Sequence, residues 1–290
     1  MRILHLFNYY LKDINIDKVK DQGFDAIQIS PIQPLKEEGQ IPWYLLYQPI
    51  NFSIGNQYGS REELIKLCNE SKENNIKIIV DVVLNHVAGK DNGELIPSEK
   101  VDNDIKSNPD FFKDNRNIIN YEDRREVIDL CIGLPCLRLD NYQLQDIIIK
   151  FLNDLIDCGV DGFRFDAAKH IKLPSEGSDF WIRVLNKLKR RDLFNYAEVI
   201  FSPKEILEEY SKYVNVLTES EALNEDISIS FVESHDSYLE FCYTNKISSE
   251  DIIKKYKELC RRRKNTLFYA RPFDNTWQRE EIKIIHQKRE

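Results

Sequence analysis

The sequence lacks any run of about 18 consecutive apolar residues, the length that a membrane-spanning helix requires. It also lacks an excess of positive charge, since 41 Lys and Arg stand against 49 Asp and Glu, for a net charge of −8. Nucleic acids and anionic membranes bind basic surfaces. We therefore expect neither a membrane protein nor a nucleic-acid binder.

Metal-binding and disulfide patterns are also missing. The six cysteines show no CxxC pair and no zinc-finger spacing (Cys68, Cys131, Cys136, Cys158, Cys242 and Cys260). Several lie in amphipathic helical patterns, where a free cysteine behaves as a small buried apolar residue. The opening letters MRILHLFNYY lead directly into a strand pattern, without a small-residue cleavage site. We expect a soluble, reduced, cytoplasmic protein.

What the sequence does contain is a regular alternation of strand and helix patterns over its 290 residues. Strands are expected at 3–8, 26–30, 77–84, 162–166, 195–198, 214–218, 227–232 and 266–270. Helices are expected at 14–22, 60–74, 142–158, 179–190, 203–212, 249–263 and 279–288. Such alternation favours a parallel sheet, and eight strands predict a (β/α)₈ TIM barrel of the α/β class.

Two stretches depart from a regular barrel. Nearly sixty residues rich in Asn, Asp, Pro and Gly precede the helix at 142–158, a length typical of a functional loop or subdomain. Only about eight residues, ESEALNED, separate the sixth and seventh strands, whereas a parallel crossover needs roughly a dozen. Unless the strand assignment there is wrong, the sixth helix is missing or reduced. We expect a barrel in two parts, 1–85 and 142–290, with a loop subdomain at 86–141 between them.

Polar residues collect where the expected strands end, which is where the catalytic residues of barrels lie. They are Asp81, Asn85 and His86 after the third strand, Arg164, Asp166, Lys169 and His170 after the fourth, Glu198 after the fifth, and His235 and Asp236 after the seventh. In GFRFDAAKH, Phe163 and Phe165 share one face of a strand, and Arg164 and Asp166 share the other. Burying an unpaired charge is costly. We therefore expect the aromatic face to pack on helices and the charged face to line a catalytic mouth.

These motifs resemble the four signature regions of the α-amylase family (glycoside hydrolase family 13). In order they are DVVLNH, GFRFDAAKH, AEV and FVESHD. GLPCLRLD at 133–140 is similar to the family's fifth region, and WYLLYQPINFSIGNQYGSREEL at 43–64 to its loop after the second strand. One short motif would be weak evidence, whereas five in register between about residues 3 and 275 are specific.

The resemblance implies a retaining hydrolase that cleaves internal α-1,4-glucosidic bonds of malto-oligosaccharides, starch or glycogen. It implies Asp166 as the nucleophile, Glu198 as the general acid and then base, and Asp236 as a residue that binds and distorts the sugar. Retention requires two carboxyls roughly 5–5.5 Å apart, one ionised and one protonated. Arg164 is expected to favour the ionised form of Asp166. Glu198 has no cation beside it in the sequence and is expected to hold the proton.

The resemblance also implies a set of sugar-binding residues. His86 and His235 would donate hydrogen bonds to sugar hydroxyls, Tyr47 would stack on the sugar ring with Gln48 beside it, and Lys169 and His170 would line the leaving-group side. Taken singly, each has a plainer reading: a structural ion pair for Arg164 and Asp166, a structural role for the histidines, and core packing for the aromatic rings. The roles of Trp43 and Tyr44 stay open, and Asp81 is expected to pair with Arg164.

The chain also departs from the family. Its calcium ion would be held by the side chain at Asn85, the carbonyl at His170 and an aspartate where this chain has Cys136. A thiol is a soft ligand that suits zinc or copper(I), so we expect no tight calcium and no cofactor, with Asn85 holding the loop by hydrogen bonds. The alternative is that Asp102, Asp104 or Asp129 supplies the missing carboxylate. Ser234 replaces the asparagine of chloride-dependent members, so chloride activation is not expected.

The family's C-terminal β-sandwich is not expected here, because the sequence ends soon after the eighth strand. Two rival functions remain open. One is a glucanotransferase or α-glucosidase of the same family, because loops set that choice. The other is a catalytically inactive glucan-binding barrel, which the trimmed barrel allows and the three intact carboxylates oppose. We expect a monomer whose partner is an α-glucan.

Overall fold

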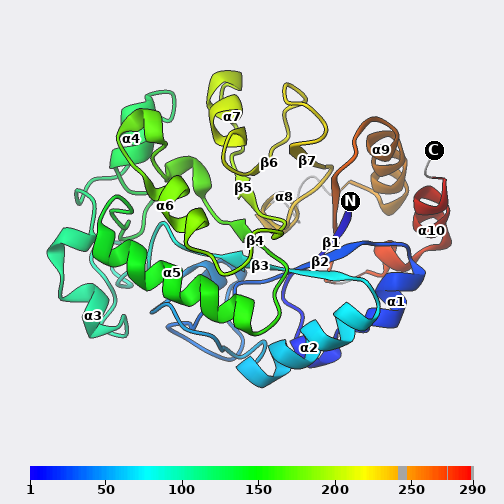
Figure 1. Ribbon diagram of the computed structural model, residues 1–290, viewed down its shortest axis with the longest axis horizontal. Coiled ribbons are helices and arrows are strands. Elements are labelled where there is room, and N and C mark those ends of the chain that lie inside the picture. Colours follow the sequence, from blue (N-terminus) through cyan, green and yellow to red (C-terminus); the bar gives the residue numbers. More distant parts are fainter. Residues whose placement is uncertain (241–246, 273, 289–290) are drawn as a thin grey trace.

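The centre of the computed structural model, which describes residues 1–240, 247–272 and 274–288, is a closed parallel barrel. Its strands pair in sequence order, and the last closes onto the first (Figure 1). They are β1 (Arg2–Leu6), β2 (Ala26–Ile29), β3 (Lys77–Val82), β4 (Gly162–Phe165), β5 (Tyr196–Glu198), β6 (Asn215–Leu217), β7 (Ser228–Phe231) and β8 (Thr266–Tyr269). This confirms the TIM barrel and every expected strand.

Helices surround the barrel where the sequence predicts them. They are α1 (Ile16–Asp21), α2 (Arg61–Glu73), α5 (Tyr142–Asp157), α6 (Phe180–Asn186), α7 (Lys204–Ser211), α9 (Ser249–Arg262) and α10 (Glu280–Gln287). α6 ends earlier than the expected residue 190, because the guanidinium of Arg191 donates to the carbonyls of Leu185 and Asn186 and closes the helix there. Within the described ranges, no helix combines the length and apolarity needed to span a membrane.

The connection from β6 to β7 contains no helix in residues 218–227, all of which the structure describes. This confirms the missing sixth helix. The short connection is held by Asn265, whose amide donates to the carbonyls of Glu225 and Asp226 at 3.2 Å each. Leu223 is buried beneath it. Hydrogen bonds from the side chain of Asn265, just before β8, thus hold this connection in the absence of a packed helix.

The long segment between β3 and α5 carries the short helices α3 (Asn103–Lys106) and α4 (Arg124–Asp129). It gathers at the left of Figure 1, on the side away from α10. Its buried apolar side chains, among them Ile105, Phe111 and Leu137, belong to the same hydrophobic cluster as the barrel. The structure therefore describes a long loop that packs on the barrel. The domain boundaries at residues 85 and 141 stay predictions.

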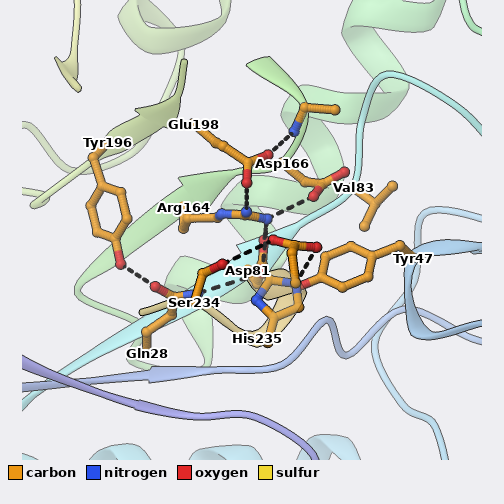
Figure 2. Close-up of polar contacts among 12 residues, drawn as sticks. Gln28, Tyr47, Asp81, Val83, Arg164, Asp166, Tyr196, Glu198, Ser234 and His235 are labelled. Atoms are coloured by element: carbon orange, nitrogen blue, oxygen red, sulfur yellow. Dashed lines mark hydrogen bonds and ion pairs between the residues drawn. The ribbon is translucent and has the colours of Figure 1, made fainter. Parts of the chain in front are cut away.

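The two faces of β4 divide as its alternation predicts. Phe163 and Phe165 are fully buried, and the ring of Phe165 meets Trp181 of α6 edge-on, with 5.3 Å between centroids. Arg164, between them, points to the barrel interior, where it finds carboxylates (Figure 2). The aromatic face therefore anchors the strand to the helical layer and leaves the charged face inside.

The start of β4 depends on a close backbone approach at Gly162. A Cβ there would lie 2.0 Å from the carbonyl oxygen of Phe194. We expect Gly162→Ala to lower the free energy of unfolding in urea by about 2 kcal/mol or more, because backbone must move. Gly39→Ala is the control: its Cβ would meet nothing within 4 Å, although its φ of 95° adds strain of about 1 kcal/mol. Equal losses in the two variants would contradict this reading.

Candidate active site

The guanidinium of Arg164 lies at the centre of three carboxylates (Figure 2). Its Nη1 donates to Asp81 Oδ1 at 2.9 Å and Oδ2 at 3.0 Å, and to Asp166 Oδ1 at 2.6 Å. Its Nη2 donates to Glu198 Oε1. The Arg164 side chain is 2% exposed and that of Asp81 is fully buried. One buried cation therefore organises acidic side chains from three neighbouring strand ends.

Strand register brings these groups together. Asp81 of β3 is paired with Arg164 of β4, and Arg164 is paired with Tyr196 of β5. Two residues further along a strand, side chains point to the same face. Asp166 is two residues after Arg164, and Glu198 is two residues after Tyr196, the partner of Arg164. Both side chains therefore point to the same side as Arg164, at the carboxyl ends where barrel active sites form.

The turn after β4 holds Glu198 from its other side. Ala167 has φ 47° and ψ 33°, a left-handed conformation that costs a residue with a Cβ about 1–2 kcal/mol. The turn directs the Ala167 N–H at Glu198 Oε2, 2.9 Å away. Both oxygens of Glu198 thus accept hydrogen bonds, one of them from Arg164. The sequence places no cation beside Glu198, because this cation comes from the adjacent strand and not from its own sequence neighbourhood. The expectation that Glu198 holds the proton stays a prediction.

Burial dominates the electrostatics of the carboxylates. It raises the pKa of Asp166 well above the ordinary value, and the pKa of Asp81 to about 6. Arg164 acts on Asp166 in the expected direction, by lowering its pKa, but its effect is smaller than that of burial and is opposed by the charges of Glu198 and Asp81. The carboxyls of Asp81 and Asp166 therefore hold protons more tightly than isolated carboxylic acids do.

Asp236 approaches from β7 through α8 (His235–Glu240). Its side chain is 39% exposed, against 9% for Asp166, so it is the most accessible carboxylate of the site. Ser234 Oγ donates to Asp236 Oδ2 at 3.4 Å, and His235 Nε2 lies 3.4 Å from Asp236 Oδ1. Burial, assisted by Arg164, lowers the pKa of His235 well below its usual value. His235 is therefore a neutral hydrogen-bonding group at neutral pH.

An aromatic wall closes one side of the site. The hydroxyl of Tyr47 donates to Asp81 Oδ2 at 2.9 Å, and its ring lies nearly parallel to His235, with centroids 5.2 Å apart. Trp43 packs edge-on against His235 at 5.6 Å, with half-exposed Tyr44 edge-on against it. Gln48 follows and is partly buried. Tyr47 therefore belongs to the carboxylate cluster, and its stacking on a sugar stays a prediction.

The remaining sequence candidates lie around this centre. His86 is buried, with Nε2 2.8 Å from the Tyr47 carbonyl, and no described residue is partnered with its Nδ1. Burial lowers its pKa to about 4. The ring of His170 is used inside the loop segment, since its Nδ1 lies 2.8 Å from the carbonyl of Val127. Lys169 Nζ lies 5.4 Å from the ring centre of Tyr121, on the side of α4.

Sequence reasoning missed three buried groups that support the centre. Gln28 of β2 donates to Asp81 Oδ2 at 3.5 Å and accepts from the hydroxyl of Tyr196 at 2.5 Å. His5 of β1 lies edge-on to His235 at 5.3 Å. A polar residue inside an otherwise apolar strand was the available signal, because such a residue needs a partner in the barrel interior.

The residues at the calcium position implied by the resemblance do not fit that ion. Lys113 Nζ donates to Asn85 Oδ1 at 3.3 Å and to the His170 carbonyl at 3.0 Å. Fully buried Cys136 supplies sulfur, and calcium takes oxygen ligands. The two oxygens that remain, Asn85 Oδ1 and the His170 carbonyl, already accept hydrogen bonds from the Lys113 amine.

Comparisons with known proteins agree with this geometry. Residues 14–267 match the family model described as the catalytic domain of alpha amylase. An alpha-amylase of Clostridium acetobutylicum is 36% identical over 228 residues, which cover 74% of this chain and 30% of that protein. The chain thus spans less than a third of that relative's length.

Solved structures of low sequence identity share the fold. Alpha-amylase I of Eisenia fetida has a TM-score of 0.76 at 20% identity, over 95% of this chain and 69% of that one. The alpha-amylase of Geobacillus thermoleovorans, solved in complex with acarbose, has a TM-score of 0.74 at 19% identity, over 98% and 77%.

The raised pKa of Asp81 gives a stability test. Its carboxyl binds a proton more tightly in the folded state than in the unfolded state, so folding loses stability as the pH rises from about 4 through 6. The Asp81→Asn variant has no such group. We expect the unfolding free energy of the wild type, minus that of the variant, to fall by about 2 kcal/mol between pH 4 and 7 in urea titrations.

Asp154→Asn is the matched control for this test. Arg61, 2.5 Å away, lowers the pKa of Asp154, so the corresponding difference should rise with pH. A difference for Asp81→Asn that is flat or rises with pH would mean that Asp81 is ionised throughout and that the account of the cluster is wrong.

Proposed function

The chain belongs to the alpha-amylase catalytic-domain family, and we propose that it is a retaining glycoside hydrolase that cleaves internal α-1,4-glucosidic bonds of malto-oligosaccharides, starch or glycogen. One observation carries the proposal: Asp166 and Glu198 are bound to the same guanidinium, with the more exposed Asp236 beside them. A retaining mechanism needs two carboxyls roughly 5–5.5 Å apart, one on each side of the scissile bond. Binding to one guanidinium holds these two carboxyls near each other.

In the first step, the ionised carboxylate of Asp166 attacks the anomeric carbon, and Glu198 gives its proton to the leaving glycosidic oxygen. The bond from the sugar to that oxygen breaks as the bond to Asp166 forms. Glu198 now accepts hydrogen bonds at both oxygens. It must therefore release one of them and take up a proton before this step, and the buried carboxyl of Asp166 supplies that proton, which leaves Asp166 ionised for the attack.

In the second step, Glu198 takes a proton from water, and the oxygen of that water attacks the anomeric carbon. The ester to Asp166 breaks, and the carboxylate returns to Arg164. Two displacements on one carbon restore its configuration. Asp236 and neutral His235 would hold sugar hydroxyls during both steps, because hydrogen bonds that strengthen in the transition state lower the barrier.

The proposal is tested by removing each carboxylate without changing its shape. Asp166→Asn and Glu198→Gln should each lower the release of reducing ends from soluble starch by at least about a thousand-fold, because the groups act as a unit. Asp154→Asn, the same replacement on α5, should retain activity. Circular dichroism checks that the variants are folded. Strong hydrolysis by either folded variant would exclude the assigned roles.

The same assay separates this function from an inactive glucan-binding barrel. If the wild type binds maltoheptaose in calorimetry but releases no reducing ends, the inactive alternative is correct. The intact set of three carboxylates supports the enzyme.

A second activity, transfer of the glucosyl unit to another sugar, is favoured by an apolar platform on the leaving-group side. Phe201, three residues after Glu198, is 80% exposed, with φ 51°, and its N–H donates to the carboxylate of Glu219 at 2.9 Å. Together with Tyr121 and Lys169 it lines a cavity of about 650 Å³. Exposed aromatic rings bind sugar faces. An acceptor sugar held there would compete with water for the intermediate.

We expect Phe201→Ala to lower the ratio of transfer to hydrolysis about two- to ten-fold, the effect of one lost aromatic contact. The ratio is measured by chromatography of the products formed from maltotriose. Ile119→Ala provides the control, since Ile119 is 90% exposed and does not line this cavity. An unchanged ratio in Phe201→Ala would exclude the platform.

We also propose that the protein works as a monomer in the cytoplasm. Cys68, Cys131, Cys136 and Cys158 are free thiols, as a reducing compartment favours, and Cys242 lies outside the described residues. The net charge of −8 supports a neutral glucan as the partner, and neither nucleic acid nor an anionic membrane. Size-exclusion chromatography with light scattering tests the monomer.

A further inference from the structure

Lys113 connects three segments that are distant in the sequence. Its Nζ donates to the side chain of Asn85, after β3, and to the carbonyl of His170, in the turn after β4. Its backbone N–H donates to the Cys136 carbonyl at 2.9 Å. One lysine thus joins the long loop segment to the carboxyl ends of two adjacent strands.

Cys136 contacts the same asparagine as Lys113, and the charges of the two residues together explain why both differ from a calcium site. Asn85 turns its amide nitrogen to Cys136 Sγ, 3.6 Å away, and leaves its amide oxygen to the Lys113 ammonium. A divalent calcium ion with one aspartate carries a net charge of +1. A lysine with a neutral thiol carries the same charge. The loss of a carboxylate is therefore balanced by the replacement of a divalent cation with a monovalent one.

Nearby carboxylates are already paired with cations. Asp129 lies 2.8 Å and Asp140 3.6 Å from Lys172 Nζ, and Asp114 lies 2.8 Å from Arg116. Asp102 and Asp104 line a different cavity, against α5. Across the part of the chain that the structure describes, no group of three or more His, Cys, Asp or Glu residues could hold a metal ion. None of these acids substitutes for the missing ligand.

The turn that Lys113 holds also positions the active site. The carbonyls of Ala168, Lys169 and His170 accept in succession from the Tyr210 hydroxyl, the Arg124 guanidinium and the Lys113 amine. Ala167, directly before them, directs its N–H at Glu198. Fixing these carbonyls fixes the left-handed residue on which the hydrogen bond to Glu198 depends.

We propose that the ammonium of Lys113 is a built-in cation that joins the loop segment to the barrel where a calcium ion would otherwise lie, so that the fold does not depend on calcium. The inference concerns folding, and it stands whether or not the protein hydrolyses glucans. It predicts that a calcium site can be created by reversing the two coupled changes, at Lys113 and at Cys136.

The test compares melting temperatures in millimolar CaCl₂ and in EDTA for the full chain. The wild type should differ by less than about 1 °C between them. Lys113→Met should melt about 3 °C or more below the wild type, because two buried oxygens lose their donor. The double variant Lys113→Met with Cys136→Asp should melt about 3 °C or more higher in calcium than in EDTA. It should also bind one calcium ion in isothermal titration calorimetry.

Lys36→Met with Cys136→Asp is the matched control. Lys36 is a buried lysine, which donates to the Gly89 carbonyl and to Asp91 in the same loop region. Its loss should lower the melting temperature without creating a response to calcium. Cys136→Asp alone should also show none, because its carboxylate pairs with Lys113.

Three results would overturn the proposal. They are a wild type stabilised by calcium and weakened by EDTA, a Lys113→Met variant as stable as the wild type, and a folded Lys113→Met, Cys136→Asp variant that binds no calcium. The first requires no substitution, so the proposal stays refutable even if Lys113→Met fails to fold.

Discussion

The pairing of one buried guanidinium with three carboxylates is the constraint on which the site depends. Arg164 is 2% exposed, and a charge buried to this extent is tolerated only with partners of opposite sign. Its partners Asp81, Asp166 and Glu198 come from β3, β4 and β5. The barrel must therefore keep these strands in register for the cation to be compensated, and the same register sets the separation of the Asp166 and Glu198 carboxyls. The stability of the fold and the proposed catalysis thus depend on the same strand register.

Two kinds of contact hold the surroundings of this centre in place. In the barrel, apolar faces such as Phe165 against Trp181 pack the strands on the helices. In the turn after β4, three successive carbonyls accept hydrogen bonds from side chains elsewhere in the chain. Lys113 belongs to that set. The loop segment thus affects the site through hydrogen bonds to backbone, while the strands position the carboxylates directly.

The barrel, the absent sixth helix and the strand-end carboxylates were predictable, because periodicity, connection length and motif spacing are local properties of a sequence. The contact of Arg164 with Glu198, the net direction of the pKa of Asp166 and the place of Lys113 were not. Each depends on residues far apart in the chain. Arg164 reaches Glu198 across 34 residues, and Lys113 reaches His170 across 57. Cys136 led to the expectation of no tight calcium, but nothing in the sequence near Lys113 pointed to its contacts with Asn85 and His170.

The central claim is that Asp166 and Glu198, bound to one cation, carry out a double displacement. The anomeric configuration of the first product tests it most directly. Proton NMR of maltoheptaose during the first minutes of digestion, before mutarotation, should show the α-anomer at the new reducing end, because two inversions at one carbon restore its configuration. An initial β-anomer would mean a single displacement by water and would contradict the role of Asp166 as nucleophile.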